Sequence, residues 1–415
     1  MNSSYSRDRN HAMRAFGLAV AVFSLGAIAF FALPSLLSVS YDGEVGASNL
    51  PVGKESQEET VRVTHLPTPE PVKAIYMTSC AAGTPTLRSH LVSLIEETEL
   101  NSIVIDIKDY TGKLSFTPDD PSLSFAVSEQ CGAIDMKEFV RTLHEKNIYI
   151  IGRVTVFQDP FLSVRRPELA VERLSDGGLW RDKKGISYLD PASQEVWDYV
   201  IAIARASYAI GFDEINFDYI RFPSDGNLAD ISYSASAGRK KADVLEDFFR
   251  YLHEKLKGSN IITSADLFGM TMTNIDDLNI GQVLERALPY FDYIAPMVYP
   301  SHYPPMFNGW ANPNENPYRL IAYVMKRGVL RAVATSTTIK TFEARQISTT
   351  TPILFEKPAW SKLKLRPWLQ DFDYGGNYGT EEVRGQIQAT YDAGLTSWML
   401  WDPSNRYTSE ALLTE

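Results

Sequence analysis

The sequence predicts an α/β protein whose main domain is a (β/α)8 TIM barrel. After residue 70, eight short runs rich in β-branched and aromatic residues alternate with longer stretches of helical periodicity. Several of these runs begin directly after a predicted helix, as strands do in βα units. The alternative is a doubly wound open sheet, but the sequence contains no GxGxxG and no GxxxxGK[ST] motif, and such sheets often carry a glycine-rich first turn.

The expected elements follow one another at regular intervals. The predicted strands are at residues 72–79, 102–109, 148–157, 212–222, 261–268, 291–299, 365–372 and 396–402. The predicted helices are at 86–99, 136–146, 194–210, 242–257, 280–287, 317–327 and 381–393. Residues 328–364 are rich in Thr and Pro and too long for a simple turn, so we expect an insertion there.

The amino-terminal segment has the pattern of a membrane anchor. Residues 15–41 contain no charge, and about 20 apolar residues suffice to span a bilayer. Basic residues before this run, Arg7, Arg9 and Arg14, predict that the amino terminus stays in the cytoplasm. A cleaved signal peptide, cut after Ser40, is the alternative.

These patterns divide the chain into four predicted parts. They are a cytoplasmic tail (1–14), a transmembrane signal anchor (15–40), a flexible linker (41–70) and the barrel domain (71–415). We therefore expect a single-pass protein of the cell membrane whose barrel lies outside the cytoplasm, or a secreted protein if the signal is cleaved.

Composition excludes several classes of function. The formal net charge of −11 argues against a nucleic-acid partner, which usually requires a basic face. Six histidines form no HExxH pair, so we expect neither a histidine-based metal site nor a cofactor. The two cysteines, Cys80 and Cys131, could form a disulfide outside the cytoplasm or remain two buried thiols; both alternatives stay open.

Charged and aromatic residues gather at the predicted strand ends, where barrel enzymes place their catalytic groups. The strand at 212–222 shows how alternation selects among them. Asn216, Asp218 and Ile220 share a face that we expect to point into the barrel, whereas Phe217 and Tyr219 should meet the helices. By the same rule Asp266 shares an inward face with Ser264.

Two carboxylates on neighbouring strands suggest cleavage of a glycosidic bond. One carboxyl must remain protonated to donate to the leaving oxygen, and the other must remain ionised. We predict Asp218 as nucleophile or base, because Lys108, Arg153 and Arg221 are expected to surround it, and Asp266 as general acid.

Further strand-end residues are predicted to bind the substrate. Tyr299 and Trp401 suit stacking on a sugar ring. The complete predicted set is Asp106, Lys108, Arg153, Asn216, Arg221, Tyr299, His302, Gln370, Asp371, Trp401 and Asp402. A structural role is the alternative for several of them: Asp106 and Lys108 as a buried ion pair, and Asp371 and Asp402 as solvated loop residues.

A resemblance adds to this interpretation. The stretches "NSIVIDIKDYTGKLSF", "DEINFDYIRFPSDG", "DYIAPMVYPSHYPP", "LRPWLQDFDYGGNYG" and "SWMLWDPSNRYT" lie between about residues 73 and 407. They resemble a bacterial family of glycoside-hydrolase-like proteins, a domain of unknown function with a TIM-barrel, glycosidase-like fold. The resemblance implies a (β/α)8 fold and a carbohydrate-active enzyme. The insertion at about 328–364 departs from this pattern.

Together these observations predict a membrane-anchored glycoside hydrolase that acts on a cell-surface or extracellular polysaccharide without a cofactor. Two alternatives remain open at this point. One is a carbohydrate-binding or envelope scaffold barrel without catalysis, and the other is a metal-dependent carbohydrate deacetylase that uses clustered aspartates.

Overall fold

The computed structural model describes residues 63–414. The predicted cytoplasmic tail and signal anchor, and most of the predicted linker, lie outside these residues and stay predictions. Among the helices of residues 63–414, none combines the length and the apolar character needed to cross a membrane.

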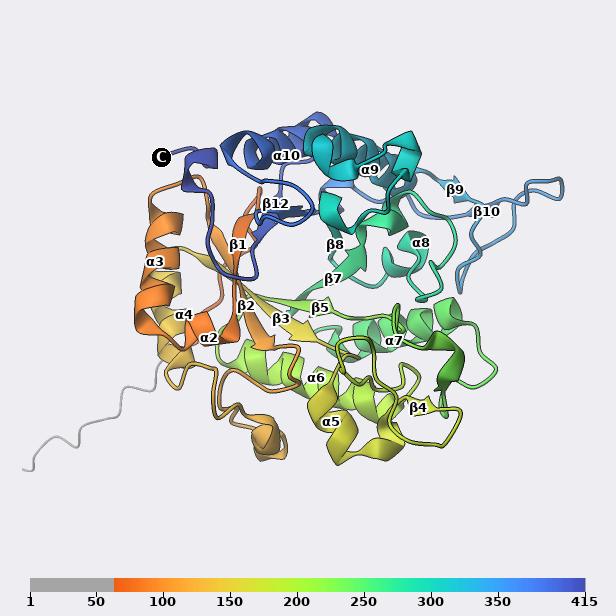
Figure 1. The fold of residues 1–415 in the computed structure, drawn as a ribbon, viewed down its shortest axis with the longest axis horizontal. Coiled ribbons are helices and arrows are strands. Elements are labelled where there is room, and N and C mark those ends of the chain that lie inside the picture. Colours follow the sequence, from red (N-terminus) through yellow and green to blue (C-terminus); the bar gives the residue numbers. More distant parts are fainter. Residues whose placement is uncertain (1–62, 415) are drawn as a thin grey trace, which may run out of the picture. The chain divides into compact units, whose positions relative to one another are not determined.

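Eight parallel strands close into a barrel, in the order β1-β12-β11-β8-β7-β5-β3-β2 (Figure 1). Their bounds are β1 Lys73–Met77, β2 Ser102–Lys108, β3 Tyr149–Thr155, β5 Glu214–Asp218, β7 Ile262–Phe268, β8 Tyr293–Met297, β11 Trp368–Gln370 and β12 Trp398–Trp401. Each strand lies within one of the eight predicted runs. The prediction of a (β/α)8 barrel is confirmed.

The strand sequences explain why the barrel is buried on both faces. All seven residues of β2, "SIVIDIK", are buried, as expected for a parallel strand covered by helices. In β1, alternate residues separate into two apolar clusters: Ala74 and Tyr76 face the barrel interior, whereas Ile75 and Met77 pack with the outer core. The same alternation positions the polar residues that reach the strand ends.

Helices surround the barrel (Figure 1). They are α2 Ser79–Ala82, α3 Pro85–Glu96, α4 Met136–Glu145, α5 Pro160–Arg165, α6 Gln194–Ala209, α7 Lys241–Leu256, α8 Leu284–Ala287, α9 Pro317–Val333 and α10 Thr380–Asp392. Each of the seven predicted helices overlaps one of them. Apolar residues on their inner faces, such as Phe248 and Phe249 of α7, are fully buried against the barrel.

The predicted insertion at 328–364 begins later than its expected start. Helix α9 continues to Val333, so the first six of these residues are helical. The remainder contains a short antiparallel pair, β9 (Ser336–Thr337) with β10 (Phe355–Glu356), and the segment between them extends away from the barrel strands (Figure 1).

Two long loops meet at the carboxyl ends of the barrel strands. Strand β4 (Glu172–Arg173), in the connection after β3, pairs antiparallel with β6 (Ile231–Ser232), in the connection after β5. This pairing joins two loops of neighbouring βα units, and sequence periodicity did not predict it.

A disulfide settles one question that the sequence left open, and a buried ion pair lies at the other end of the barrel. Cys80 and Cys131 form a disulfide, with their Cα atoms 4.3 Å apart. At the opposite end of the barrel, Glu214 accepts a hydrogen bond from the buried Arg366 at 2.8 Å. The start of β5 therefore contributes to stability, as expected for the amino-terminal ends of barrel strands.

Candidate active site

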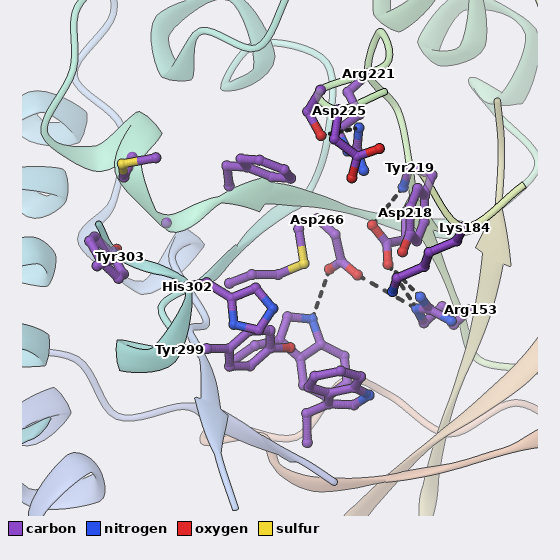
Figure 2. A pocket seen from close by; sticks show the side chains of 17 residues that line it. Arg153, Lys184, Asp218, Tyr219, Arg221, Asp225, Asp266, Tyr299, His302 and Tyr303 are labelled. Carbon is purple, nitrogen blue, oxygen red and sulfur yellow. Dashed lines mark hydrogen bonds and ion pairs between the residues drawn. The ribbon is translucent and has the colours of Figure 1, made fainter. Parts of the chain in front are cut away.

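A cavity of about 280 Å³ opens at the carboxyl ends of the barrel strands (Figure 2). Six of the eight strands contribute to its wall. The residues that they supply are Arg153 of β3, Asp218 of β5, Asp266 and Phe268 of β7, Met297 of β8, Trp368 of β11 and Trp401 of β12. This is the end of a barrel where substrates bind.

Asp218 is held in an ion pair at the floor of the cavity. Its Oδ2 atom accepts hydrogen bonds from Nη2 and Nε of Arg153, at 2.5 and 3.1 Å. Its Oδ1 atom accepts from the backbone N–H of Tyr219 at 2.5 Å. The guanidinium group and the backbone donor both stabilise the ionised carboxylate.

Asp266 lies on the neighbouring strand in a different environment. Its Oδ1 atom accepts hydrogen bonds from Asn216 Nδ2 at 2.9 Å and Trp368 Nε1 at 2.8 Å. The residue is only 1% exposed. Burial and the nearby negative charge of Asp218 raise the pKa of Asp266 well above its usual value, despite these two donors and Arg153.

Arg153 connects the two carboxylates. Its Nε atom is 3.1 Å from Asp218 Oδ2 and 3.9 Å from Asp266 Oδ2, so these two oxygens are no more than 7.0 Å apart. Figure 2 shows both carboxylates turned toward the guanidinium group. Its Nη1 atom donates to Asp106 at 2.6 Å, which adds a third carboxylate to the same cation.

An aromatic wall stands beside the carboxylates. The Tyr299 and Trp401 rings lie 5.0 Å apart, and Trp401 is the more exposed of the two. His302 lies next to Tyr299, with their ring centroids 5.3 Å apart. Burial, together with the charge of Lys184, lowers the pKa of His302, so this imidazole is neutral at neutral pH. Such a wall can stack against the apolar face of a sugar.

Arg221, Lys184 and Asp225 also line the cavity (Figure 2). Arg221 Nη1 donates to Ser224 Oγ and to the backbone oxygen of Phe222, both at 3.1 Å. Lys184 comes from the connection after β3, and Asp225 comes from the connection after β5. Two loops that are distant in sequence thus complete the mouth of the cavity.

A family model described as "Putative glycosyl hydrolase domain" matches residues 74–407. The chain belongs to this family. The match spans all eight barrel strands except the first residue of β1, and it includes both carboxylates of the cavity. No curated protein matches the sequence significantly.

Solved structures with related folds include glycoside hydrolases. The glycoside hydrolase domain of PgaB (BpsB) from Bordetella bronchiseptica is 13% identical, with a TM-score of 0.54, over 83% of this chain and 99% of that one. Alpha-L-fucosidase isoenzyme 2 from Paenibacillus thiaminolyticus is 11% identical, with a TM-score of 0.51, over 82% of this chain and 48% of that one. At these identities the likeness concerns the fold alone.

A hypothetical protein from Ruminiclostridium thermocellum ATCC 27405 is more similar in sequence. It is 34% identical, and the match covers 50% of this chain and 98% of that one, with a TM-score of 0.42.

Within this glycosyl hydrolase domain, seven of the predicted site residues meet at one cavity. They are Asp218, Asp266, Arg153, Arg221, Tyr299, His302 and Trp401. Asn216 lies just behind the wall, where its side chain bridges Ser264 and Asp266. Asp106 lines a neighbouring cavity and reaches the main one only through Arg153.

The predicted alternation fails after Asp218. We expected Tyr219 to meet the helices and Ile220 to point inward, but Tyr219 lines the cavity and Ile220 is fully buried in the outer core. Strand β5 ends at Asp218, and Tyr219 adopts a left-handed backbone conformation with φ 52°. A single residue in this left-handed conformation ends the alternation of side chains between the two faces of the strand.

Lys108 does not reach the cavity, contrary to the prediction. Its side chain is fully buried, and Nζ lies 2.9 Å from Asp159 and 2.5 Å from the backbone oxygen of Thr155. The register of β2 against β3 also shifts between Asp106 and Lys108. Lys108 therefore forms a buried, structural ion pair, and its partner is Asp159 rather than Asp106.

Three more residues that were predicted to bind substrate, at the ends of β11 and β12, also lie outside the cavity. The Gln370 side chain accepts hydrogen bonds from Ser301 and donates to the backbone of Phe372. Asp371 accepts from Thr408, and Asp402 accepts from the backbone of the turn that follows it. These side chains connect loops to the barrel and do not line the cavity, because each is directed at neighbouring backbone.

The predicted set also lacked some residues that line the cavity. Trp368 donates to Asp266, and the alternation within its short strand pointed to an inward position. Phe268 carries the same signal, since it shares the inward face of its strand with Ser264 and Asp266, whereas Lys184 and Asp225 carry none because they come from irregular loops. Among residues 63–414, no group of three or more His, Cys, Asp or Glu side chains is arranged to hold a metal ion.

Proposed function

We propose that this chain is a glycoside hydrolase that cleaves O-glycosyl bonds in a cell-surface or extracellular polysaccharide. One observation carries the proposal: two carboxylates with opposite electrostatic environments face one cavity from neighbouring strands. Such a pair is what general acid catalysis combined with an ionised partner requires.

Asp266 is the general acid in this proposal. A raised pKa keeps its carboxyl group protonated at a pH where ordinary aspartates are ionised. Two donors occupy Oδ1, so the acidic proton is on Oδ2, the oxygen nearer to Arg153 and Asp218. From there it passes to the glycosidic oxygen of the departing sugar.

Asp218 is the ionised partner. The ion pair with Arg153 and the hydrogen bond from Tyr219 N–H stabilise its negative charge, which it needs either to attack the anomeric carbon or to activate water. The bound on the distance between the two Asp Oδ2 atoms, 7.0 Å, accommodates both geometries. Trp401 and Tyr299 provide a surface on which the sugar ring stacks.

The location proposed for this activity is the outer face of the membrane. The uncharged run at 15–40 anchors the chain, and residues after 70 lie outside the cytoplasm. This part of the proposal rests on the sequence, together with a disulfide, which is typical of oxidising compartments.

The test is hydrolysis of a polysaccharide panel by the full chain and by two variants, Asp218→Asn and Asp266→Asn. Both variants should lose at least about 100-fold in kcat/KM. Asp266→Asn should recover most of its activity on an aryl glycoside whose phenolate leaves without a proton, and Asp218→Asn should not. Asp371→Asn serves as the matched control, since it changes a strand-end aspartate outside the cavity.

The outcomes also separate the alternatives. Glycan binding without release of reducing ends, in wild type and variants alike, would indicate a binding or scaffold barrel. Release of acetate that a chelator abolishes would indicate a metal-dependent deacetylase. Either result overturns the proposal.

A further inference from the structure

Arg221 is the least satisfied buried charge in the cavity. Its side chain and backbone together are only 8% exposed, and its guanidinium carbon lies 4.9 Å from the Tyr219 ring centre and 5.0 Å from that of Phe268. Only Nη1 makes hydrogen bonds within the described residues, to Phe222 and Ser224. The Nε and Nη2 donors therefore remain available to a ligand.

The buried Arg366 and the half-buried Arg153 differ from Arg221 in having a carboxylate partner. Arg366 pairs with Glu214 at 2.8 Å, and Arg153 pairs with both Asp106 and Asp218. Arg221 forms no ion pair with a carboxylate among residues 63–414. Burying a charge without a partner is costly, so such a group is retained where a ligand supplies the opposite charge.

Lys184 adds a second cation at the same mouth. It is exposed, makes no ion pair within the described residues, and lies near enough to His302 to lower the pKa of that imidazole. Asp225 lines the same mouth but forms no ion pair with either cation; its Oδ1 atom accepts from the backbone N–H of Lys183 at 3.3 Å. The charge of Asp182 also acts on Tyr188 and Tyr219, the rings beside Arg221, but Asp182 forms no ion pair with Arg221 or Lys184 within residues 63–414. Both cations at this mouth are therefore without a carboxylate partner in the part of the chain that the structure describes.

The deeper half of the cavity has its own charge network. Arg153 is shared by Asp218 and Asp106, and Asp266 is the carboxyl group that holds a proton. Arg221 and Lys184 form no ion pair with these carboxyl groups within residues 63–414, and Arg221 is three residues along the chain from the carboxylate that acts on the anomeric carbon. A sugar next to the cleaved bond would reach Arg221.

We propose that the substrate is an acidic glycan, and that Arg221 and Lys184 bind an anionic group on a sugar next to the cleaved bond. This inference rests on the proposed hydrolase function and specifies its substrate class. The anion can be a uronic-acid carboxylate or an ester sulfate or phosphate, since a guanidinium fork binds each of them with two parallel hydrogen bonds. Because the whole chain carries −11, long-range attraction is not expected, and recognition depends on these local cations.

The test measures binding of three probes to the full chain in detergent by calorimetry. They are uronic-acid oligosaccharides, the same oligosaccharides with carboxyl groups reduced to hydroxymethyl groups, and the reduced oligosaccharides carrying ester sulfate or phosphate. We expect at least one charged probe to bind at least tenfold more tightly than the neutral one. The charged probe that binds identifies the source of the anion.

Variants assign this preference to residues. Arg221→Gln and Lys184→Gln should each weaken binding of the charged probe about tenfold and that of the neutral probe less than twofold, whereas Arg221→Lys should recover part of the loss. Lys183→Gln is the matched control, because its side chain does not line the cavity, and should bind like wild type. Asp225→Asn should bind the charged probe more tightly. Arg221→Gln should fold, since it removes an unpaired buried charge, and its thermal unfolding checks this.

Equal binding of charged and neutral probes, or no effect of Arg221→Gln on a folded variant, overturns the inference. If the protein hydrolyses neutral glycans but no charged ones, the inference is also wrong, whereas the proposed hydrolase function is supported. If none of the probes is bound and no member of the polysaccharide panel is hydrolysed, both proposals are wrong.

Discussion

At the scale of single residues, Arg153 determines the electrostatics of the site. It contacts Asp106 and Asp218 directly and lies 3.9 Å from Asp266. Tyr76 donates from its hydroxyl group to the second oxygen of Asp106 at 2.5 Å, so the network continues to β1. One cation therefore connects carboxyl groups from three strands.

Replacing Arg153 with Met should destabilise the protein by roughly 3–5 kcal/mol, because it leaves buried carboxylates without their counter-charge. Hydrolysis should also fall, since the Asp218 carboxylate would lose the cation that pairs with it and positions it. Chemical denaturation and kinetics on the same samples measure both effects. Arg153→Lys, which keeps the charge but not the fork, should lie between wild type and Met. An unchanged unfolding free energy in Arg153→Met would contradict this description of the network.

The raised pKa of Asp266 predicts the alkaline limb of the pH profile. A general acid works only while protonated, so kcat/KM should fall as the pH rises through the pKa of Asp266. This limb should lie above the ordinary range for an aspartate. In Asp266→Asn, the activity that remains on an aryl glycoside should lack the limb. A limb that persists there would assign the acid to another group.

At the scale of elements, the ends of β11 and β12 are fastened by side chains that we first predicted to bind substrate. Asp371 follows β11 and accepts hydrogen bonds from the backbone N–H and the hydroxyl group of Thr408, close to the carboxyl terminus. Burial raises the pKa of Asp371 to about 6. The element is thus held by a carboxyl group whose ionisation is unfavourable in the folded state.

The contribution of Asp371 can be tested by measuring the free energy of unfolding as a function of pH. The folded protein binds the Asp371 proton more tightly than the unfolded chain does, so the contribution of this group falls as the pH rises from about 4 to about 6. The shift corresponds to roughly 3 kcal/mol of stability lost by pH 7. In Asp371→Asn, the unfolding free energy should decline less over this interval than in wild type. Parallel curves for the two proteins would show that Asp371 is not the responsible group.

At the scale of the whole molecule, a barrel with loops at one end presents a cavity to the outside while its other end is closed by structural contacts. The pair of Glu214 and Arg366 lies at the start of the strands, and the catalytic candidates lie at their ends. In a single-pass membrane protein this barrel would be connected to its anchor through residues 41–70.

The predicted anchor leads to a fractionation experiment. The full chain should sediment with membranes and dissolve only in detergent, because residues 15–40 are long enough to span a bilayer. A variant lacking residues 1–60 should remain in the aqueous fraction. Protease added to intact cells should degrade the barrel domain of the full chain. A full chain recovered without detergent, and shortened by about 40 residues, would indicate the cleaved signal peptide instead.

The sequence by itself determined the eight strands, the barrel fold and the inward side of neighbouring strands on which Asp218 and Asp266 lie, because β-branched runs and two-residue alternation are local properties of the chain. It could not determine which charged strand ends reach the cavity. Lys108 turns to Asp159, Tyr219 leaves the alternation with a positive φ, and Lys184 arrives from a distant loop paired through β4 and β6. These outcomes depend on long-range packing and on which buried charges pair with each other. The spacing of apolar and polar residues along the chain contains no information about either.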